Sequence, residues 1–179
     1  RIWSLKPVKT VVMKFGGSSV ADAEKIKNVA WRVIETRDAG NKVVVVVSAP
    51  GDTTDDLITW AEKITSEPDE REMDMLLSTG EQMSIALLAM AIKDQGSKAI
   101  SLTGAQVGIL TDKVHSMAKI VHIHTDKIKK ELKKGNIVVV AGFQGITEDE
   151  DIAKNAKRVI KIKDGEIAQN WCSTPKHFN

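Results

Sequence analysis

Residues 43–47 read VVVVV, and the segment SAPGDTT follows at once at positions 48–54. β-Branched residues favour strands because their stiff side chains pack well on a pleated surface. A strand without polar alternation is buried on both of its faces, as in a parallel sheet. The five valines therefore predict a central parallel strand that ends in a polar loop.

The segments on either side of this strand alternate between strand and helix patterns. Further strands are predicted where short apolar runs occur, at 11–14, 98–102, 120–123 and 137–141. Helices are predicted where apolar residues recur at helical spacing, at about 26–34, 53–64, 73–92 and 125–132. Residues 104–115 predict loops with short strand pieces. Such alternation predicts right-handed crossovers and an α/β sandwich.

In folds of this kind, ligands bind at the carboxyl ends of the strands. Conspicuous loops follow the predicted strands there, at 15–19, 48–54, 101–106 and 142–145. We expect a candidate site where these loops meet.

The first of these loops belongs to a lysine-glycine turn, KFGGSS at 14–19. Gly16 and Gly17 let the backbone approach a ligand, and successive N–H groups there can form an anion nest. The helix that follows would present its positive end to the same place. Lys14 could bring a full charge to a phosphoryl group. The spacing fits neither a Walker A loop nor a dinucleotide fingerprint, and a plain strand-to-helix turn with a surface lysine is the alternative.

Three other polar residues are candidates for contacts to a small ligand. Ser48 and Thr54 flank the loop after the valines, although helix capping is an alternative role for them. Glu81 stands in an otherwise apolar helical stretch, where burial would demand a partner such as an α-amino group. Its neighbour Gly80 costs a helix about 1 kcal/mol relative to alanine. A helix that starts at Thr79 and exposes Glu81 is the alternative.

Composition narrows the partners and the compartment. The 179 residues contain 26 lysines and arginines against 24 acidic residues, a balance that favours neither nucleic acid nor a membrane surface. Uninterrupted apolar runs fall far short of the roughly 20 residues of a membrane span. The single cysteine, Cys172, allows no internal disulfide and favours a reducing, cytoplasmic compartment. His122 and His124 lack a carboxylate cluster nearby, so we expect no metal site there.

Taken in order, these motifs and several others resemble the amino-terminal half of the catalytic domain of aspartokinases, from Val11 to Ile146. The matching segments are KFGGSSV (14–20), VSA (47–49), TTD (53–55), LLSTGEQ (76–82), SLTGAQ (101–106), GI (108–109), TD (111–112) and AGFQG (141–145). The resemblance implies the fold of the amino-acid kinases and carbamate kinase, a three-layer α/β/α sandwich around a mainly parallel sheet, here truncated. It also implies transfer of the γ-phosphoryl group of ATP, with Mg²⁺, to the β-carboxylate of L-aspartate. That reaction begins the route to lysine, threonine and methionine.

The resemblance also assigns roles to individual residues. Those that it places at the phosphates are Lys14, Gly16, Gly17 and Ser18. Those that it places around aspartate are Ser48, Thr54, Glu81 and Phe143. Lys14 is the implied catalytic residue, because it stabilises the transferring phosphoryl group, and Glu81 pairs with the α-ammonium group. The implied partners are L-aspartate, ATP, and either a second copy of the chain or a missing carboxyl-terminal half.

After Thr147 the sequence no longer resembles the family. Aspartokinases continue into a Gly-Arg-Gly-Gly-Ser-Asp segment and a nucleotide-binding half, which this sequence does not contain. We expect 1–10 to be a leader or tag remnant and 11–147 to be the substrate-binding lobe. For 148–179 we expect a tail outside the family, with a short helix, a hairpin and a disordered end. Such a chain is either a catalytically incomplete kinase fragment or a non-catalytic module for aspartate binding or assembly.

Overall fold

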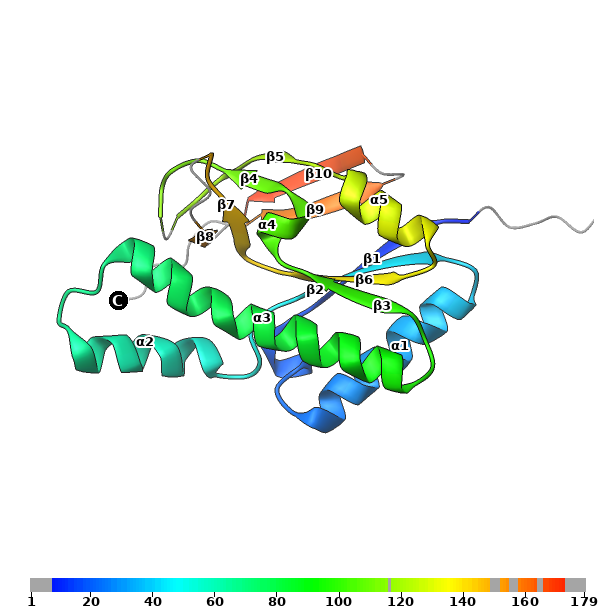
Figure 1. The fold of residues 1–179 in the computed structure, drawn as a ribbon, viewed down its shortest axis with the longest axis horizontal. Coiled ribbons are helices and arrows are strands. Elements are labelled where there is room, and N and C mark those ends of the chain that lie inside the picture. Colours follow the sequence, from blue (N-terminus) through cyan, green and yellow to red (C-terminus); the bar gives the residue numbers. More distant parts are fainter. Residues whose placement is uncertain (1–7, 116, 149–151, 155–157, 164–165, 173–179) are drawn as a thin grey trace, which may run out of the picture.

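The computed structural model describes residues 8–115, 117–148, 152–154, 158–163 and 166–172. Its main sheet is parallel, with the strand order β1-β2-β6-β3 (Figure 1). The strands of this sheet are β1 (Thr10–Phe15), β2 (Lys42–Val47), β6 (Ile137–Ala141) and β3 (Ala99–Leu102). The five valines lie in β2, between β1 and β6, so the predicted central parallel strand is confirmed.

The valines of β2 build two separate cores because successive side chains of a strand point to opposite faces. Val43, Val45 and Val47 pack on the side covered by α1 (Ala23–Asp38) and α3 (Glu70–Asp94). Val44 belongs to the other core, which includes residues of α5 (Asp126–Lys133). Helices therefore cover both faces of the sheet (Figure 1), and the predicted three-layer α/β/α sandwich is confirmed.

Local capping decides where the helices begin. The Asp22 carboxylate accepts a hydrogen bond of 2.8 Å from the backbone N–H of Lys25 at the start of α1, and this bond lowers the pKa of Asp22. Asp69 caps α3 by accepting from the N–H of Glu72 at 3.1 Å. That cap explains why α3 begins at Glu70, earlier than the apolar pattern predicts. Helix α2 (Thr53–Ile64) follows Asp52, whose side chain makes no capping hydrogen bond.

A buried carboxylate organises the connection from α5 to β6. The two oxygens of Glu131 accept hydrogen bonds of 2.8 Å each from Lys134 and Asn136. These bonds lower the pKa of Glu131, with that from Lys134 as the larger cause. Gly135 then turns the chain with a φ of 80°, a left-handed conformation that glycine adopts without strain. The helix predicted at about 125–132 is confirmed as α5.

A smaller mixed sheet, in the order β5-β4-β7-β8, lies beside the main one. Its strands are β5 (Ile120–Ile123), β4 (Ile109–Thr111), β7 (Gln144–Ile146) and β8 (Ile152–Lys154). The sequence predicts only loops and strand pieces at 104–115, but the structure also has a short helix there, α4 (Gly104–Val107). A capping box between Thr103 and Gln106 holds its first turn.

The last part of the chain contains the predicted hairpin. Strands β9 (Arg158–Lys163) and β10 (Glu166–Cys172) pair antiparallel, and the turn residues between them lie outside the described residues. The short helix predicted to open at 147–150 falls largely outside the described residues, and residues 152–154 form β8, which pairs with β7. The expectation of a disordered end is wrong for Trp171 and Cys172, which belong to β10. Residues 173–179 lie outside the described residues.

Helix α3 is long and rich in apolar residues. Among the described helices it alone is long and apolar enough to cross a bilayer, judged by length and composition. Core helices of soluble proteins meet the same criterion, and 44% of its most apolar window is buried inside the protein. Its buried residues include Ile85, Leu88 and Ile92, which pack in the core beside β2. We infer that α3 serves as a core helix.

Shortening a side chain of this core should destabilise the whole domain. Val139 of β6 is 0% exposed in the core beneath α1 and α3. We expect Val139→Ala to lower the free energy of unfolding by on the order of 2 kcal/mol, through lost burial and a residual cavity. Val121 of β5 is 70% exposed, so Val121→Ala should change stability by less than about 0.5 kcal/mol. Urea unfolding measures the stability of both variants, and equal losses would contradict the burial of Val139 in the core.

Candidate functional site

Two loops at the carboxyl end of the sheet are held against each other. The first contains the 3₁₀ turn Gly17–Ser19, and the second follows β2. The N–H of Gly51 donates to the carbonyl of Gly17 at 3.0 Å. A Cβ on Gly17 would stand 2.7 Å from the carbonyl oxygen of Ala49, closer than any side chain tolerates. Glycine at position 17 therefore permits the contact that brings the two loops together.

A pocket of about 540 Å³ opens between these loops and α3. Five of the residues that the sequence predicts for the site line it: Gly17, Ser48, Thr54, Glu81 and Phe143. Its other lining residues are Ala49, Gly51, Ile58, Pro68, Glu70, Met73, Asp74 and Leu77. A second hollow of about 610 Å³ lies between α1 and α3, and none of the predicted site residues lines it. The structure thus brings the predicted amino-acid contacts together in one place.

Glu81 is a buried polar group of this pocket. It is 2% exposed and lies in the middle of α3, which continues unbroken from Glu70 to Asp94. The alternative of a helix that starts at Thr79 and exposes Glu81 is therefore wrong. Gly80 explains how the helix comes so close to the loop, since a Cβ there would stand 2.8 Å from the Cβ of Ala49. The helix accepts a glycine because this packing requires one.

Phe143 joins the pocket to the lysine-glycine turn. Its φ is 55°, the only positive φ among the described residues that are not glycine. A bulky side chain rarely adopts this conformation, and such strain is typical of functional sites. The ring lines the pocket, and its centroid lies 5.3 Å from Nζ of Lys14, within cation–π range. Phe143 therefore contacts both the lysine and the pocket.

The residues predicted for phosphate contacts lie on a more open part of the surface. Lys14, Gly16 and Ser18 are exposed, and a Cβ on Gly16 would meet nothing within 4 Å. The helix that follows contributes less than the sequence predicts, because α1 begins only at Ala23 and its first turn already bonds the Asp22 carboxylate. The turn therefore offers backbone and a lysine to an anion, without a free helix terminus directly behind it.

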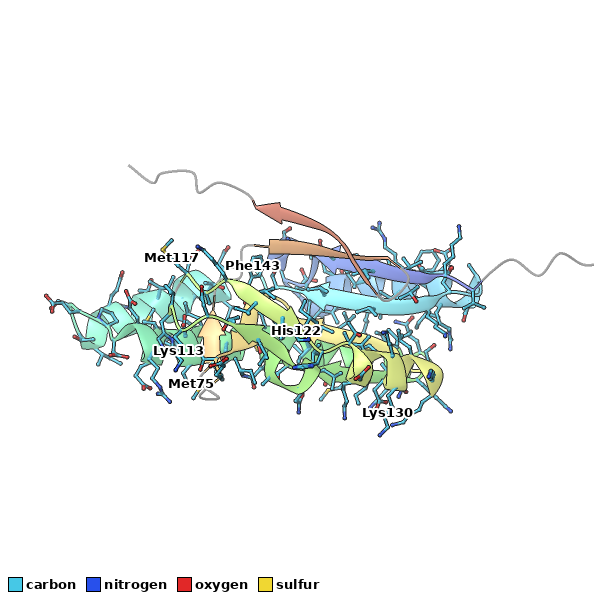
Figure 2. All side chains as sticks on the ribbon, turned by 90° about the horizontal axis from the view of Figure 1, so that it is seen from above. Met75, Lys113, Met117, His122, Lys130 and Phe143 are labelled. Carbon is cyan, nitrogen blue, oxygen red and sulfur yellow. The ribbon has the colours of Figure 1, made fainter. Side chains whose placement is uncertain are left out.

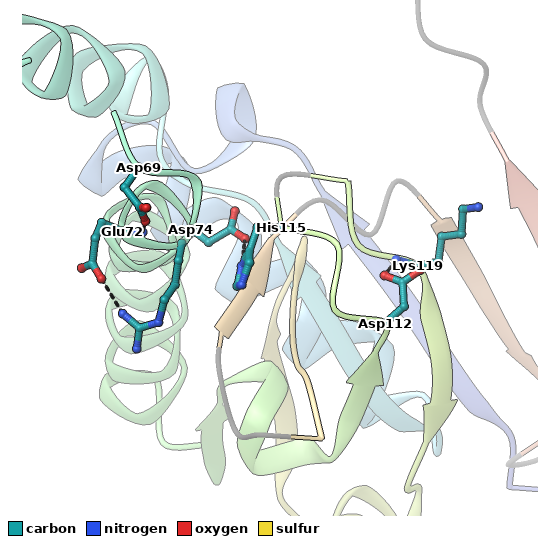
Figure 3. Close-up of polar contacts among 7 residues, drawn as sticks. Asp69, Glu72, Asp74, Asp112, His115 and Lys119 are labelled. Carbon is teal, nitrogen blue, oxygen red and sulfur yellow. Dashed lines mark hydrogen bonds and ion pairs between the residues drawn. The ribbon is translucent and has the colours of Figure 1, made fainter. Parts of the chain in front are cut away.

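Sequence reasoning missed two residues at this pocket, Asp74 and His115. Asp74 is 1% exposed, lines the pocket, and its Oδ2 lies 3.0 Å from Nδ1 of His115 (Figure 3). Asp74 precedes Glu81 by seven residues, about two helical turns, so spacing alone could have placed both on one face. His115 gave no such indication, because the two residues are 41 positions apart.

The two histidines considered in the sequence lie elsewhere. His122 and His124 are both exposed, and their ring centroids stand 4.5 Å apart in an edge-to-face arrangement. Within the described ranges, no three His, Cys, Asp or Glu side chains are grouped so that they could hold a metal ion by themselves.

An α/β sandwich with a polar pocket at the carboxyl ends of its strands is a common architecture for enzymes that bind small molecules. Comparison with known proteins identifies the family within this class. The model of the amino acid kinase family matches residues 9–160. The chain therefore belongs to the amino acid kinase family.

Known relatives point to one branch of that family. The chain is 57% identical over 142 residues to an aspartokinase of Geobacillus stearothermophilus, across 79% of this chain and 35% of that protein. Solved aspartate kinase from Synechocystis is 46% identical, with a TM-score of 0.69, across 80% of this chain and 23% of that one. E. coli aspartokinase III with aspartate and ADP is 21% identical, with a TM-score of 0.70, across 81% and 43%; at that identity it shows the fold alone. The chain spans about a third of the length of the curated relatives that it matches.

The contact between Gly80 and Ala49 gives a direct test of how the pocket is built. Alanine normally stabilises a helix by about 1 kcal/mol relative to glycine. Here we expect Gly80→Ala to destabilise the fold by about 1–3 kcal/mol, because the new Cβ meets Ala49. Adding Ala49→Gly removes that obstacle and should restore part of the loss. Urea unfolding of the three variants provides the measurement, and a more stable Gly80→Ala protein would contradict the close approach.

Proposed function

We propose that this chain provides the amino-acid-binding lobe of the catalytic domain of an aspartate kinase. The supporting observation is Glu81, a carboxylate that is 2% exposed and shares one pocket with Ser48, Thr54 and Phe143. A buried carboxylate is stable only when it meets positive charge or hydrogen-bond donors. The α-ammonium group of an amino acid supplies both.

The remaining groups of the pocket suit L-aspartate. The hydroxyls of Ser48 and Thr54 can donate hydrogen bonds to its carboxylates. Glu81 binds the α-ammonium group through a charge-assisted hydrogen bond. This leaves the β-carboxylate free to act as a nucleophile, and it is already ionised at neutral pH. No general base is needed for the attack, and positioning provides most of the catalysis.

The phosphoryl step takes place at the lysine-glycine turn. A β-carboxylate oxygen of aspartate attacks the γ-phosphorus of ATP in line, the bond to the β–γ bridging oxygen breaks, and ADP leaves. Lys14 stabilises the charge on the transferring group, and the backbone of Gly16, Gly17 and Ser18 borders the phosphates. Mg²⁺ fits a site without a dedicated ligand cluster, because it is commonly held by one or two carboxylates together with phosphates and water. When bound, it neutralises phosphate charge.

The wider setting follows from the same assignment. The product, an acyl phosphate of aspartate, would enter the biosynthesis of lysine, threonine and methionine in the cytoplasm. We further propose that the chain works with a second copy of itself or with a carboxyl-terminal nucleotide-binding half. Exposed apolar side chains support such a partner surface: Trp60 and Ile64 on α2 are 64% and 86% exposed, and Met90 on α3 is 63% exposed.

A second candidate is a non-catalytic role, in which the pocket binds aspartate or the chain only assembles with a partner. The contrast between the buried Glu81 and the exposed Lys14 favours this candidate, because amino-acid binding does not depend on the phosphate side. Calorimetry with L-aspartate and with ATP separates the two candidates. Aspartate binding without any affinity for ATP, either alone or with a supplied carboxyl-terminal half, would support the non-catalytic role.

Two substitutions test the proposed roles through aspartate-dependent ADP release, measured for the chain alone and with the carboxyl-terminal half of an aspartokinase added. Lys14→Ala should lower kcat on the order of 100-fold, because it removes charge that stabilises the transition state.

Glu81→Gln should mainly raise KM for aspartate, by on the order of tenfold, because it removes the partner of the ammonium group. Lys42→Ala serves as the control, since Lys42 lies at the opposite end of the sheet. A near-normal kcat for Lys14→Ala would refute the role of Lys14.

A further inference from the structure

The pocket contains a second buried carboxylate that the proposed function does not explain. Asp74 is 1% exposed and Glu81 is 2% exposed, and both line the pocket from the same helix. An amino acid with one ammonium group needs one carboxylate partner, which Glu81 provides. The carboxylate of Asp74 has no ammonium group of the ligand to bind, and an unshielded negative charge there would repel the carboxylates of the ligand.

The charge of L-aspartate makes this problem acute. The ligand brings two carboxylates into a pocket that already holds two buried ones, Asp74 and Glu81, and that the exposed Glu70 also lines. Like charges a few ångströms apart repel each other, and they do so more strongly in a partly buried site than in water. Binding is favoured only if the Asp74 carboxylate is held away from the carboxylates of the ligand.

His115 is placed to do this. Its Nδ1 lies 3.0 Å from Oδ2 of Asp74 (Figure 3), and because an ionised carboxylate only accepts hydrogen bonds, Nδ1–H is the donor. The side chain of His115 is 22% exposed and that of Asp74 is 2% exposed, so the bond is partly shielded from water. Hydrogen bonds to charged groups are the stronger ones in proteins.

The segment that presents His115 is itself held at its base. It connects β4 to β5, and the N–H of Asp112 donates to the carbonyl of Lys119 at 3.0 Å. The N–H of Lys119 returns a hydrogen bond of 2.9 Å to the Asp112 carboxylate. These two bonds close the base of the connection (Figure 3), while His115 bonds to α3. The imidazole of His115 is thus presented to Asp74 from a connection whose two ends are hydrogen-bonded to each other.

We propose that His115 is a positioning residue of the amino-acid pocket, which holds the Asp74 carboxylate against the β4–β5 connection and away from the carboxylates of the substrate. This inference rests on the proposed function for the identity of the ligand. It assigns to His115 no contact with the substrate and no part in the phosphoryl step.

Calorimetry with L-aspartate and L-asparagine tests the proposal. We expect His115→Ala to weaken L-aspartate binding on the order of tenfold, the loss typical of a charge-assisted hydrogen bond. L-Asparagine should lose clearly less affinity, because its side chain has no charge for Asp74 to repel. His115→Asn keeps an N–H donor close to the place of Nδ1 and should bind L-aspartate almost normally. His122→Ala is the matched control, because His122 is exposed on β5 (Figure 2), and it should change nothing.

A double-mutant cycle separates this role from a merely structural one. Asp74→Asn removes the charge, so it should bind L-aspartate at least as well as the unaltered protein. In that background, His115→Ala should cost less than about threefold, because the two residues act through the same interaction. If His115→Ala does not fold, Asp74→Asn still decides, since weaker L-aspartate binding by that variant overturns the proposal.

The remaining outcomes are equally distinct. Equal losses for L-aspartate and L-asparagine, additive effects in the cycle, or no effect of His115→Ala would each overturn the positioning role. If the unaltered chain binds no L-aspartate, the proposed function fails instead. In that case amide hydrogen exchange at 112–115 and 117–119 still tests the contact, because His115→Ala should speed exchange there and unchanged rates overturn it.

Discussion

Ala49 and Gly80 meet where the loop after β2 passes α3, and there is no room for a Cβ on the helix at that point. This close approach places the polar groups of the loop, Ser48 and Thr54, across one pocket from Glu81. It depends in turn on the two-sided burial of β2, which fixes the end of the strand and therefore the start of the loop. A methyl group at position 80 would push the helix outward and separate the groups that the site needs. The constraint is steric, but its consequence is electrostatic, because it keeps the carboxylate of Glu81 buried in the pocket.

Most of the fold could be predicted from the hydrophobic pattern, because strands that are buried on both faces appear in the sequence as continuous apolar runs. The valines of β2, the apolar run of β6 and the helical spacing in α1 and α3 all form the elements that they predict. The misses share a physical cause. Strands β7 and β8 are held by pairing with each other and with β4, and partners far apart in sequence leave no local periodicity. The short helix α4 was readable from its capping box, whereas periodicity needs more residues than one turn offers.

The site residues that could be predicted are those whose signal lies within one short segment of the sequence. A short stretch of sequence is enough to show glycines at the end of a strand or a carboxylate within an apolar helix. Ser48, Thr54, Glu81 and Phe143 were found in that way or through resemblance, and the structure brings them to one pocket. The bond between Asp74 and His115 joins α3 to the β4–β5 connection, and residues 41 positions apart cannot be paired from the sequence alone. The burial of Asp74 beside a second buried acid, Glu81, is seen only in the folded structure.

The two halves of the proposed chemistry lie in different dielectric surroundings, and this difference shapes what each can achieve. Glu81 is enclosed, so its attraction to an ammonium group is strong and specific. Lys14 is exposed, and a charge in water attracts another at 4 Å by only about 1 kcal/mol, against about 4 kcal/mol when water is largely excluded. Phosphoryl transfer at Lys14 therefore gains most from exclusion of water, which bound nucleotide or further protein would provide. The amino-acid pocket can select its ligand before that happens, because its decisive charges are already buried.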